Sequence, residues 1–126
     1  MPIDATAPYD DSNIFARILR GELPCTKVYE DAHALAFNDI NPQAPVHVLV
    51  IPKGAYVSWD DFHDKASDAE IVAFTRAVGR VARMMGVDKS GYRLLANVGS
   101  DGHQEVPHLH VHVFGGRQLG RMLPKE

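Results

Sequence analysis

The chain of 126 residues has a single cysteine, no excess of basic residues and no long hydrophobic segment. The lone Cys25 excludes an internal disulfide and any zinc site built from several cysteines. Thirteen Lys and Arg residues stand against sixteen Asp and Glu residues, so a basic nucleic-acid-binding surface is not expected. The longest apolar stretch, residues 46–51, is interrupted by His47 and is far shorter than the roughly 18 residues of a membrane helix.

The N-terminal segment also lacks the cationic and then apolar pattern of a signal peptide. Residues 1–10 are rich in Ala, Pro and Asp, and we predict that they form a flexible tail. The remaining residues, 11–126, have the length and apolar content of one domain with a real core. We therefore expect a cytoplasmic protein that binds neither nucleic acid nor membrane.

Hydrophobic periodicity predicts two helices and five strands. Ser12 is the expected N-cap of a short helix that ends at Gly21. Ser67 and Glu70 form a capping box for a longer helix, which ends at Gly86. The predicted strands are residues 27–30, 35–38, 46–52, 92–98 and 108–114. Because short turns join most of these strands, we predict an α+β domain with a five-stranded antiparallel sheet.

The last predicted strand reads His-Leu-His-Val-His-Val-Phe over residues 108–114. Successive side chains of a strand point to opposite faces, so His108, His110 and His112 are expected on one face and the apolar residues between them on the other. Three imidazoles on one face are hard to explain by packing, since each ring nitrogen needs a hydrogen-bond partner. The spacing therefore indicates a functional site.

Two kinds of chemistry would use such a row of histidines. Two His at positions i and i+2 can bind a metal ion, with Asp101, Glu105 or His47 completing the site. An imidazole can instead act as a nucleophile, provided that its tautomer is held by a bond to the other ring nitrogen. The loop Gly99–Gly102 can direct backbone N–H groups at an anion, and Gln104 adds a side-chain donor. This loop favours phosphate chemistry, so we predict neither a metal nor a cofactor.

Three segments of the chain resemble the histidine triad (HIT) superfamily. HLHVHVF has the family's signature, alternating three His with apolar residues, and lies within NVGSDGHQEVPHLHVHVFGGRQL. NIFARILRGELP and AFNDINPQAPVHVLVIPK precede it in the same order as in the family. The resemblance is strongest to the Hint branch of nucleoside phosphoramidases. It implies a homodimer in which two sheets join into one continuous ten-stranded sheet.

The resemblance also implies roles for four histidines. His110 would be the nucleophile, attacking the α-phosphorus of a purine nucleoside phosphoramidate to form a nucleotidyl-histidine that water then hydrolyses. His108 and His112 would bond phosphate oxygens or hold the triad, and one of them would help to protonate the leaving amine. His47 matches a fourth histidine behind the triad, which would orient its neighbours.

The nucleotide-binding residues follow from the same resemblance. They are Phe15, Ile18, Phe37, Asp39, Ile40, Asn97, His103, Gln104 and Glu105. Asp39 would bond both ribose hydroxyls, and the four apolar residues would surround the purine. A Glu105 carboxylate would repel a phosphate, so its contact is expected through the backbone N–H. His103 replaces a glycine of close relatives, while His33 and His63 match nothing in the family and are expected at the surface.

Three other functions stay open at this point. A second HIT activity is hydrolysis of a dinucleoside polyphosphate. A metal hydrolase with histidine ligands, or a nucleotide-binding interaction module without catalysis, belongs to another class. The segment after Gly116 lacks a tryptophan found near the end of some HIT proteins, so the preferred leaving group is left open.

Overall fold

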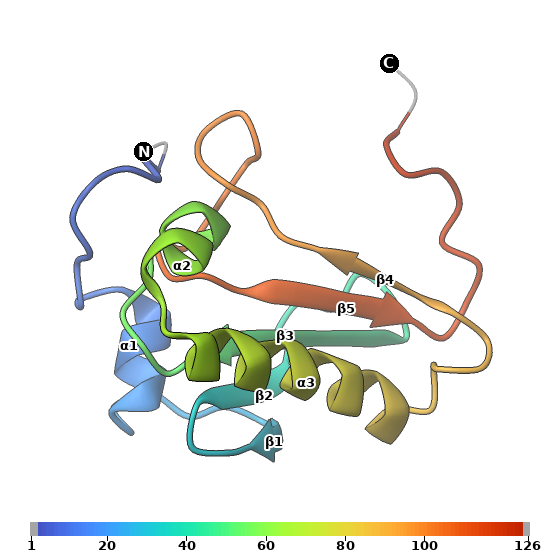
Figure 1. Ribbon diagram of the computed structural model, residues 1–126. Coiled ribbons are helices and arrows are strands. Elements are labelled where there is room, and N and C mark those ends of the chain that lie inside the picture. Colours follow the sequence, from blue (N-terminus) through green and yellow to red (C-terminus); the bar gives the residue numbers. More distant parts are fainter. Residues whose placement is uncertain (1–2, 125–126) are drawn as a thin grey trace.

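The computed structural model describes residues 3–124 and has one five-stranded antiparallel sheet with helices on both faces (Figure 1). The elements are α1 Ile14–Leu19, β1 Lys27–Glu30, β2 Ala34–Asn38, β3 Val46–Pro52, α2 Trp59–Lys65, α3 Asp68–Met84, β4 Tyr92–Leu95 and β5 Val111–Gly115. The strand order is β1-β2-β3-β5-β4, and every neighbouring pair is antiparallel. The α+β class and the five-stranded sheet are therefore confirmed.

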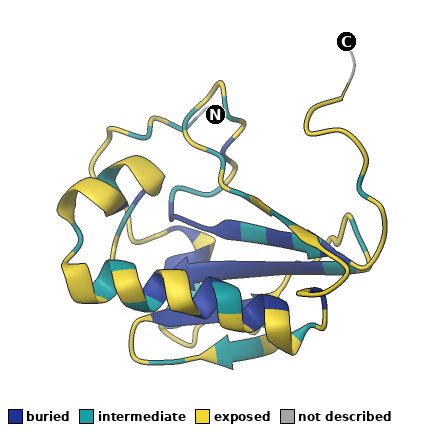
Figure 2. Ribbon diagram, turned by 45° about the vertical axis from the view of Figure 1, so that its right-hand side comes forward, coloured by how far each residue is buried: buried dark blue, intermediate teal, exposed yellow. Residues whose placement is uncertain are grey.

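One face of the sheet is covered by α3, whose start is set by the predicted capping box. The Ser67 side chain accepts from the Glu70 backbone N–H, and the Glu70 carboxylate accepts from the Ser67 backbone N–H. Figure 2 shows the inner side of this helix buried and its outer side exposed. The core on this face includes Phe74, Ala77, Val78 and Val81 of α3 and Val48, Val50, Val111 and Val113 of the sheet. Within residues 3–124, no helix is both long and apolar enough to cross a membrane.

The opposite face of the sheet carries α1 and a smaller apolar cluster. Phe15 of α1 packs with four strand residues, Leu35, Phe37, Leu49 and Ile51. Leu49 and Ile51 alternate along β3 with the valines that face α3, as expected for a strand covered on both sides. The N-cap of α1 is Asn13 and not the predicted Ser12, because the Asn13 side chain accepts the hydrogen bond from the Ala16 N–H at 2.9 Å.

The prediction of two helices was wrong by one, since α2 is a third. This helix has seven residues and buries only Phe62, which is too little for a helical periodicity to be visible. Its sequence signal is the capping box formed by Ser58 and Asp61.

Both C-terminal strands are shorter at one end than predicted. The ladder between β4 and β5 runs only from Tyr92↔Gly115 to Leu95↔His112. Before His112 the chain leaves this ladder, and the Leu109 N–H bonds the carbonyl of Tyr56 instead. Residues 108–110 therefore precede β5.

The predicted tail falls partly within the described residues. Residues 3–10 form neither helix nor strand, and the hydroxyl of Tyr9 lies 2.6 Å from Nδ1 of His108. Positions 1–2 of the tail and 125–126 of the domain lie outside the described residues. The domain boundary at residue 10 stays a prediction.

Candidate active site

The structure brings the three histidines of residues 108–112 together on the α1 face of the sheet. The residues between them, Leu109 and Val111, belong to the core under α3. The ring centroids of His110 and His112 are 5.1 Å apart, and the Phe15 ring meets His110 edge-on at 5.0 Å. His108 and His110 are buried, whereas His112 is partly exposed.

The hydrogen bond of His110 determines which of its nitrogens carries the proton. Nδ1 lies 2.7 Å from the backbone carbonyl oxygen of His108. A carbonyl only accepts, so Nδ1 must donate, and the neutral ring keeps its lone pair on Nε2. Burial lowers the pKa of His110, an effect partly offset by the bond to the His108 carbonyl. At neutral pH this imidazole is therefore uncharged, with an unprotonated Nε2.

Both ring nitrogens of His108 are occupied by protein groups. Nε2 lies 2.8 Å from the carbonyl oxygen of Pro52 and must donate to it, so Nδ1 accepts from the hydroxyl of Tyr9 at 2.6 Å. Burial lowers the pKa of His108 to about 4. A ring with both nitrogens bound has no free donor or acceptor for a substrate, and its contribution to the site is its backbone carbonyl.

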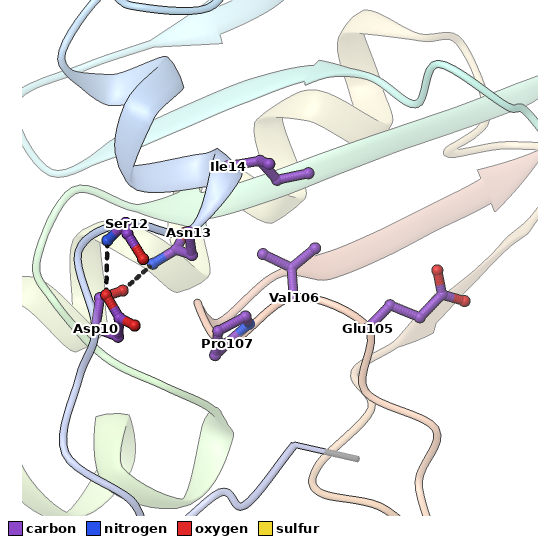
Figure 3. A pocket seen from close by; sticks show the side chains of 7 residues that line it. All are labelled: Asp10, Ser12, Asn13, Ile14, Glu105, Val106 and Pro107. Carbon is purple, nitrogen blue, oxygen red and sulfur yellow. Dashed lines mark hydrogen bonds between the residues drawn. The ribbon is translucent and has the colours of Figure 1, made fainter. Parts of the chain in front are cut away.

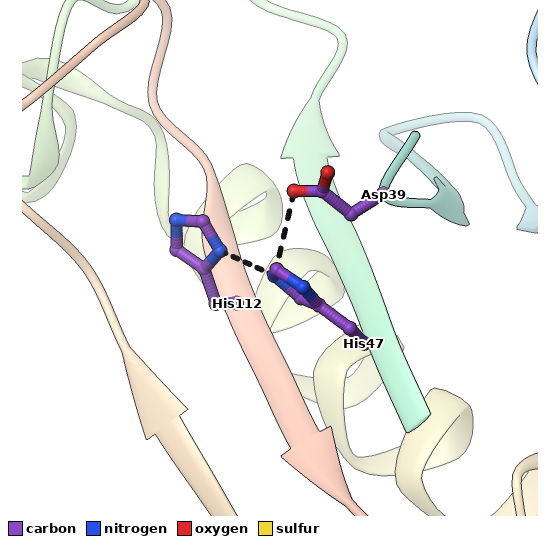
Figure 4. A group of neighbouring side chains, drawn as sticks. All are labelled: Asp39, His47 and His112. Carbon is purple, nitrogen blue, oxygen red and sulfur yellow. Dashed lines mark hydrogen bonds and ion pairs between the residues drawn. The ribbon is translucent and has the colours of Figure 1, made fainter. Parts of the chain in front are cut away.

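His47 and His112 form a second hydrogen-bonded chain beside Asp39 (Figure 4). The backbone N–H of Gln43 donates to Nδ1 of His47 at 3.1 Å, so the proton of His47 is on Nε2. This Nε2–H donates to Nδ1 of His112 at 2.9 Å, and an Asp39 carboxylate oxygen lies 3.4 Å from the same Nε2. Neutral His112 therefore carries its own proton on Nε2. The site thus offers an unprotonated Nε2 on His110 next to an Nε2–H on His112.

Burial also keeps the rings of His47 and His112 uncharged. It lowers the pKa of His112 to about 4, with smaller effects of the same sign from His110 and His47. Burial lowers the pKa of His47 as well, and the nearby Asp39 carboxylate partly opposes this.

Within residues 3–124, one group of side chains has the spacing of a metal site, and it is not the one expected. Potential ligand atoms of Asp39, His47 and His112 lie within 4.8 Å of one another. The predicted helpers Asp101 and Glu105 are not part of this group. A metal ion bound there would have to replace the proton that links His47 and His112.

The apolar residues predicted to surround a purine are divided between the core and the surface. Phe15 and Phe37 are buried and meet edge to face at 5.5 Å, while Ile18 is half-buried against them. Ile40 follows Asp39 beyond the end of β2 and is 91% exposed. Core packing therefore uses most of the two aromatic rings, and Ile40 presents the free apolar surface beside Asp39.

The loop before the histidines is held by hydrogen bonds within it and by one to the segment before α2. The Gln104 side chain accepts from the Gly99 N–H at 2.9 Å and donates to the carbonyls of Val57 at 2.7 Å and Val106 at 3.0 Å. The N–H groups of His103 and Gln104 bond the carbonyls of Ser100 and Gly99. The expected donors at Gly99 and Gln104 are thus already occupied in this structure.

The other predicted phosphate contacts lie around this loop. Asn97 follows β4 and is half-buried. His103 has a φ of +58°, a conformation that favours glycine, and its exposed ring lies 3.4 Å from the Glu105 carboxylate. His33 and His63 are exposed, as predicted.

A depression of about 250 Å³ separates this loop from the segment before α1. Figure 3 shows Asp10, Ser12, Asn13 and Ile14 on one side and Glu105, Val106 and Pro107 on the other. Sequence reasoning missed Tyr9, which belongs to the same N-terminal segment. An aromatic residue among small and acidic ones was the available signal.

The chain is similar in sequence and in fold to known proteins. The family model "HIT domain" matches residues 20–119, beginning after Tyr9 and α1. An uncharacterised HIT-like protein of Azospirillum brasilense is 65% identical over 117 residues, covering 93% of this chain and 96% of its own. The purine nucleoside phosphoramidase of Escherichia coli is 40% identical over 116 residues, which are 90% of this chain and 94% of that protein. The structure of a histidine triad protein from Clostridium difficile matches with a TM-score of 0.80 and 42% identity. The match covers 92% of this chain and 100% of that one.

Proposed function

The chain belongs to the HIT domain family, and from this premise we propose that it hydrolyses purine nucleoside 5′-phosphoramidates through a covalent intermediate on His110. The observation that carries the proposal is the bond from His110 Nδ1 to the His108 carbonyl, which leaves a lone pair on Nε2. The 40% identity to a purine nucleoside phosphoramidase supports the choice of substrate class.

In the first step, Nε2 of His110 attacks the α-phosphorus. A bond from Nε2 to phosphorus forms, the bond from phosphorus to the amine nitrogen breaks, and its electron pair leaves with the amine. His110 becomes an imidazolium whose Nδ1–H still donates to the His108 carbonyl at the distance of 2.7 Å seen in the free protein. That carbonyl stabilises the positive charge, since hydrogen bonds to charged donors are the stronger ones.

His112 is the imidazole placed to assist this step. Because both nitrogens of His108 are bound to protein groups, the Nε2–H of His112 is the ring donor next to His110. It bonds a phosphate oxygen, and after taking up a second proton beside the phosphate it gives its Nε2 proton to the leaving amine and returns to the neutral ring. An anionic phosphate beside His112 raises the pKa of this ring, because an opposite charge favours its protonated form.

In the second step, water attacks the phosphorus of the nucleotidyl-histidine. The bond from Nε2 of His110 to phosphorus breaks, its electron pair returns to Nε2, and a nucleoside monophosphate is released. The proton that the water loses returns to His112, which restores the acid of the first step. His47, hydrogen-bonded to His112 at 2.9 Å, holds the donor ring through both steps.

The nucleotide is proposed to lie between the imidazoles and the end of β2. Asp39 accepts from the ribose hydroxyls, and Ile40 with the edges of Phe15, Ile18 and Phe37 contacts the purine. Asn97 and the loop of His103, Gln104 and Glu105 contact the phosphate. Glu105 acts through its backbone N–H, and Gln104 would exchange one of its bonds to a carbonyl for this contact. These contacts remain proposals that rest on the family resemblance and on the position of Asp39, 3.4 Å from His47.

The decisive experiment is to trap the intermediate. The protein is mixed with adenosine 5′-phosphoramidate, quenched within milliseconds to seconds, digested and examined by mass spectrometry for adenylate on His110. The variant His110→Ala should carry no adduct and show no turnover. His63→Ala is the matched control, since His63 is an exposed histidine on α2. Turnover by His110→Ala at the wild-type rate would overturn the proposal.

The same assay separates the alternatives. Faster turnover of diadenosine polyphosphates than of phosphoramidates would favour the second HIT activity. Loss of activity with a chelator and recovery with zinc would favour a metal hydrolase using Asp39, His47 and His112. Nucleotide binding without turnover above background would favour an interaction module.

We propose in addition that two copies pair through β4 into a ten-stranded sheet. β4 is an edge strand of the described sheet, and its Tyr92 and Leu94 are 41% and 49% exposed. An open edge with exposed apolar residues favours pairing with another strand. Light scattering of the wild type should give twice the chain mass, and Leu94→Glu should shift it toward one chain mass. A wild-type protein that is monomeric at every concentration tested would contradict the pairing.

A further inference from the structure

Tyr9 is a polar side chain that bonds one of the histidines and that the mechanism above does not use. Its hydroxyl lies 2.6 Å from Nδ1 of His108, and its ring meets the His108 ring edge-on with centroids 5.6 Å apart. Since Nε2 of His108 must donate to the Pro52 carbonyl, the Tyr9 hydroxyl is the donor in this bond. Burial raises the pKa of Tyr9, so the phenol keeps its proton throughout the neutral range.

The segment that carries Tyr9 is bonded to the N-cap of α1 on its C-terminal side and lies beside the loop before the histidines on its N-terminal side. The side-chain amide of Asn13, the N-cap of α1, donates to the carbonyl of Asp10 at 2.8 Å. Further toward the N-terminus, Ile3 and Ala5 lie against Gly99, at the start of the loop before the histidines. Figure 1 likewise draws the N-terminal segment beside this loop. The segment of Tyr9 therefore runs between the loop before the histidines and α1, and the bond from Asn13 to Asp10 fixes the end next to α1.

We infer that Tyr9 is a positioning residue, which keeps the nucleophile His110 aligned by fixing His108; this inference rests on the function proposed above. The connection runs through the ring and the backbone carbonyl of His108. Tyr9 and Pro52 together bind both nitrogens of the His108 ring, and the backbone carbonyl of His108 accepts the Nδ1–H of His110. Without the Tyr9 hydroxyl, Nδ1 of the buried His108 loses its donor. A buried acceptor without a partner is unfavourable, so the ring and the carbonyl next to it are expected to shift.

The test compares two Tyr→Phe variants in the full-length protein. Tyr9→Phe keeps the aromatic ring and removes only the hydroxyl that bonds His108. Tyr29→Phe is the matched control, because the Tyr29 hydroxyl bonds Asp31 and Arg80 at the far edge of the sheet. With adenosine 5′-phosphoramidate as substrate, we expect kcat of Tyr9→Phe to fall about 5- to 20-fold, while KM changes little. The control should keep the wild-type kcat.

Nitrogen-15 NMR of the histidine rings supplies a measurement that does not depend on turnover. In the wild type, His108 should show an unprotonated, hydrogen-bonded Nδ1 and His110 a protonated Nδ1. In Tyr9→Phe, the Nδ1 signal of His108 should move toward that of a free nitrogen, and the Nδ1–H population of His110 should fall. Tyr29→Phe should leave both signals in place.

These outcomes separate the inference from the proposed function. A wild type without phosphoramidase activity would sink the proposed function, while the NMR comparison would still decide whether Tyr9 controls the ring of His110. Unchanged kcat and unchanged His110 signals in Tyr9→Phe, with only a lower melting temperature, would overturn the inference and leave Tyr9 as a packing residue.

Discussion

The two faces of the sheet are built from the same strands but hold together by different means. On the α3 face, β3 and β5 contribute Val48, Val50, Val111 and Val113, which pack without any polar atom. On the α1 face, the same strands and the residues just before β5 contribute four histidines, whose bonds assign a proton to one nitrogen of each ring. Among the described residues, no buried side-chain nitrogen or oxygen lacks a partner.

This difference has a physical consequence. Apolar packing is not directional, so the α3 face determines how stable the sheet is and only loosely how each side chain is oriented. Hydrogen bonds are directional, and a buried group that loses its partner is costly. The α1 face therefore determines which nitrogen can react. Changes on the α1 face should alter activity more than stability, and changes on the α3 face the reverse.

The largest effect is expected from replacing the nucleophile on the α1 face. His110→Asn keeps a side-chain N–H that can donate to the His108 carbonyl but has no nucleophilic nitrogen. We expect kcat with adenosine 5′-phosphoramidate to fall by about 10³-fold or more, while the melting temperature stays near that of the wild type. Stopped assays measure kcat, and calorimetry on the same preparation measures the melting temperature. A large loss of stability would show that the two faces are not separable in this way.

Acid should weaken the α1 face through its buried imidazoles. The pKa of His108 and of His112 is about 4 in the folded protein, against about 6.5 in an unfolded chain. Between these values the unfolded chain binds more protons, so the free energy of unfolding falls as the pH falls from about 6.5 toward 4, and this contribution is fully present above 6.5. For His108 alone the loss at pH 5 is on the order of 2 kcal/mol. Urea unfolding between pH 7.5 and 4.5 measures it.

The control for the acid effect removes one of the titrating rings. His108→Gln can still donate to the Pro52 carbonyl but takes up no proton in this range. Its free energy of unfolding should depend less steeply on pH than that of the wild type. Parallel curves for the two proteins would assign the acid effect to other groups.

On the α3 face we expect a substitution to lower stability while activity changes little. Val113 follows His112 in β5 and is fully buried in the core. Val113→Ala removes two methyl groups, which should lower the free energy of unfolding by about 2 kcal/mol. The kcat at 25 °C should stay within about twofold of the wild type, since no bond to an imidazole is lost. Loss of activity in the folded variant would count against the separation of the faces.

The smallest change in free energy is expected from a substitution at His47, behind the reacting histidines. His47→Ala removes the donor to Nδ1 of His112, and we expect kcat to fall about tenfold. His47→Gln, whose amide N–H can reach toward the same nitrogen, should recover part of this loss. Equal activity of the two variants and the wild type would mean that the bond between His47 and His112 does not contribute to the reaction.

Much of the fold was predictable because its signals are local. The capping box of Ser67 and Glu70 set the start of α3, and β3 matched the predicted range of 46–52. α2 escaped prediction because seven residues with one buried side chain, Phe62, contain too little periodicity. The early end of the ladder at His112 was equally invisible, since it depends on the remote carbonyls of Pro52 and Tyr56.

The candidate site was also predictable in part from the sequence. The alternation of His with Leu and Val in residues 108–113 was enough to predict which side chains share a face, because successive side chains of an extended chain point to opposite sides. The resemblance to the HIT family likewise came from the sequence. The hydrogen bonds of Gln104 could not be predicted from the sequence: its side-chain amide donates to the carbonyls of Val106 in the same loop and of Val57 just before α2.

Only the tertiary structure decided the protonation of His108 and His112. The groups that assign their protons are Tyr9 and Pro52 for His108 and His47 for His112, all far from these rings in the sequence. The four histidines have the same covalent structure, yet His110 has a free lone pair and His112 a free N–H, while His108 and His47 hold these two rings in place. A tautomer is set by whatever lies across from each nitrogen, and folding alone brings those groups together.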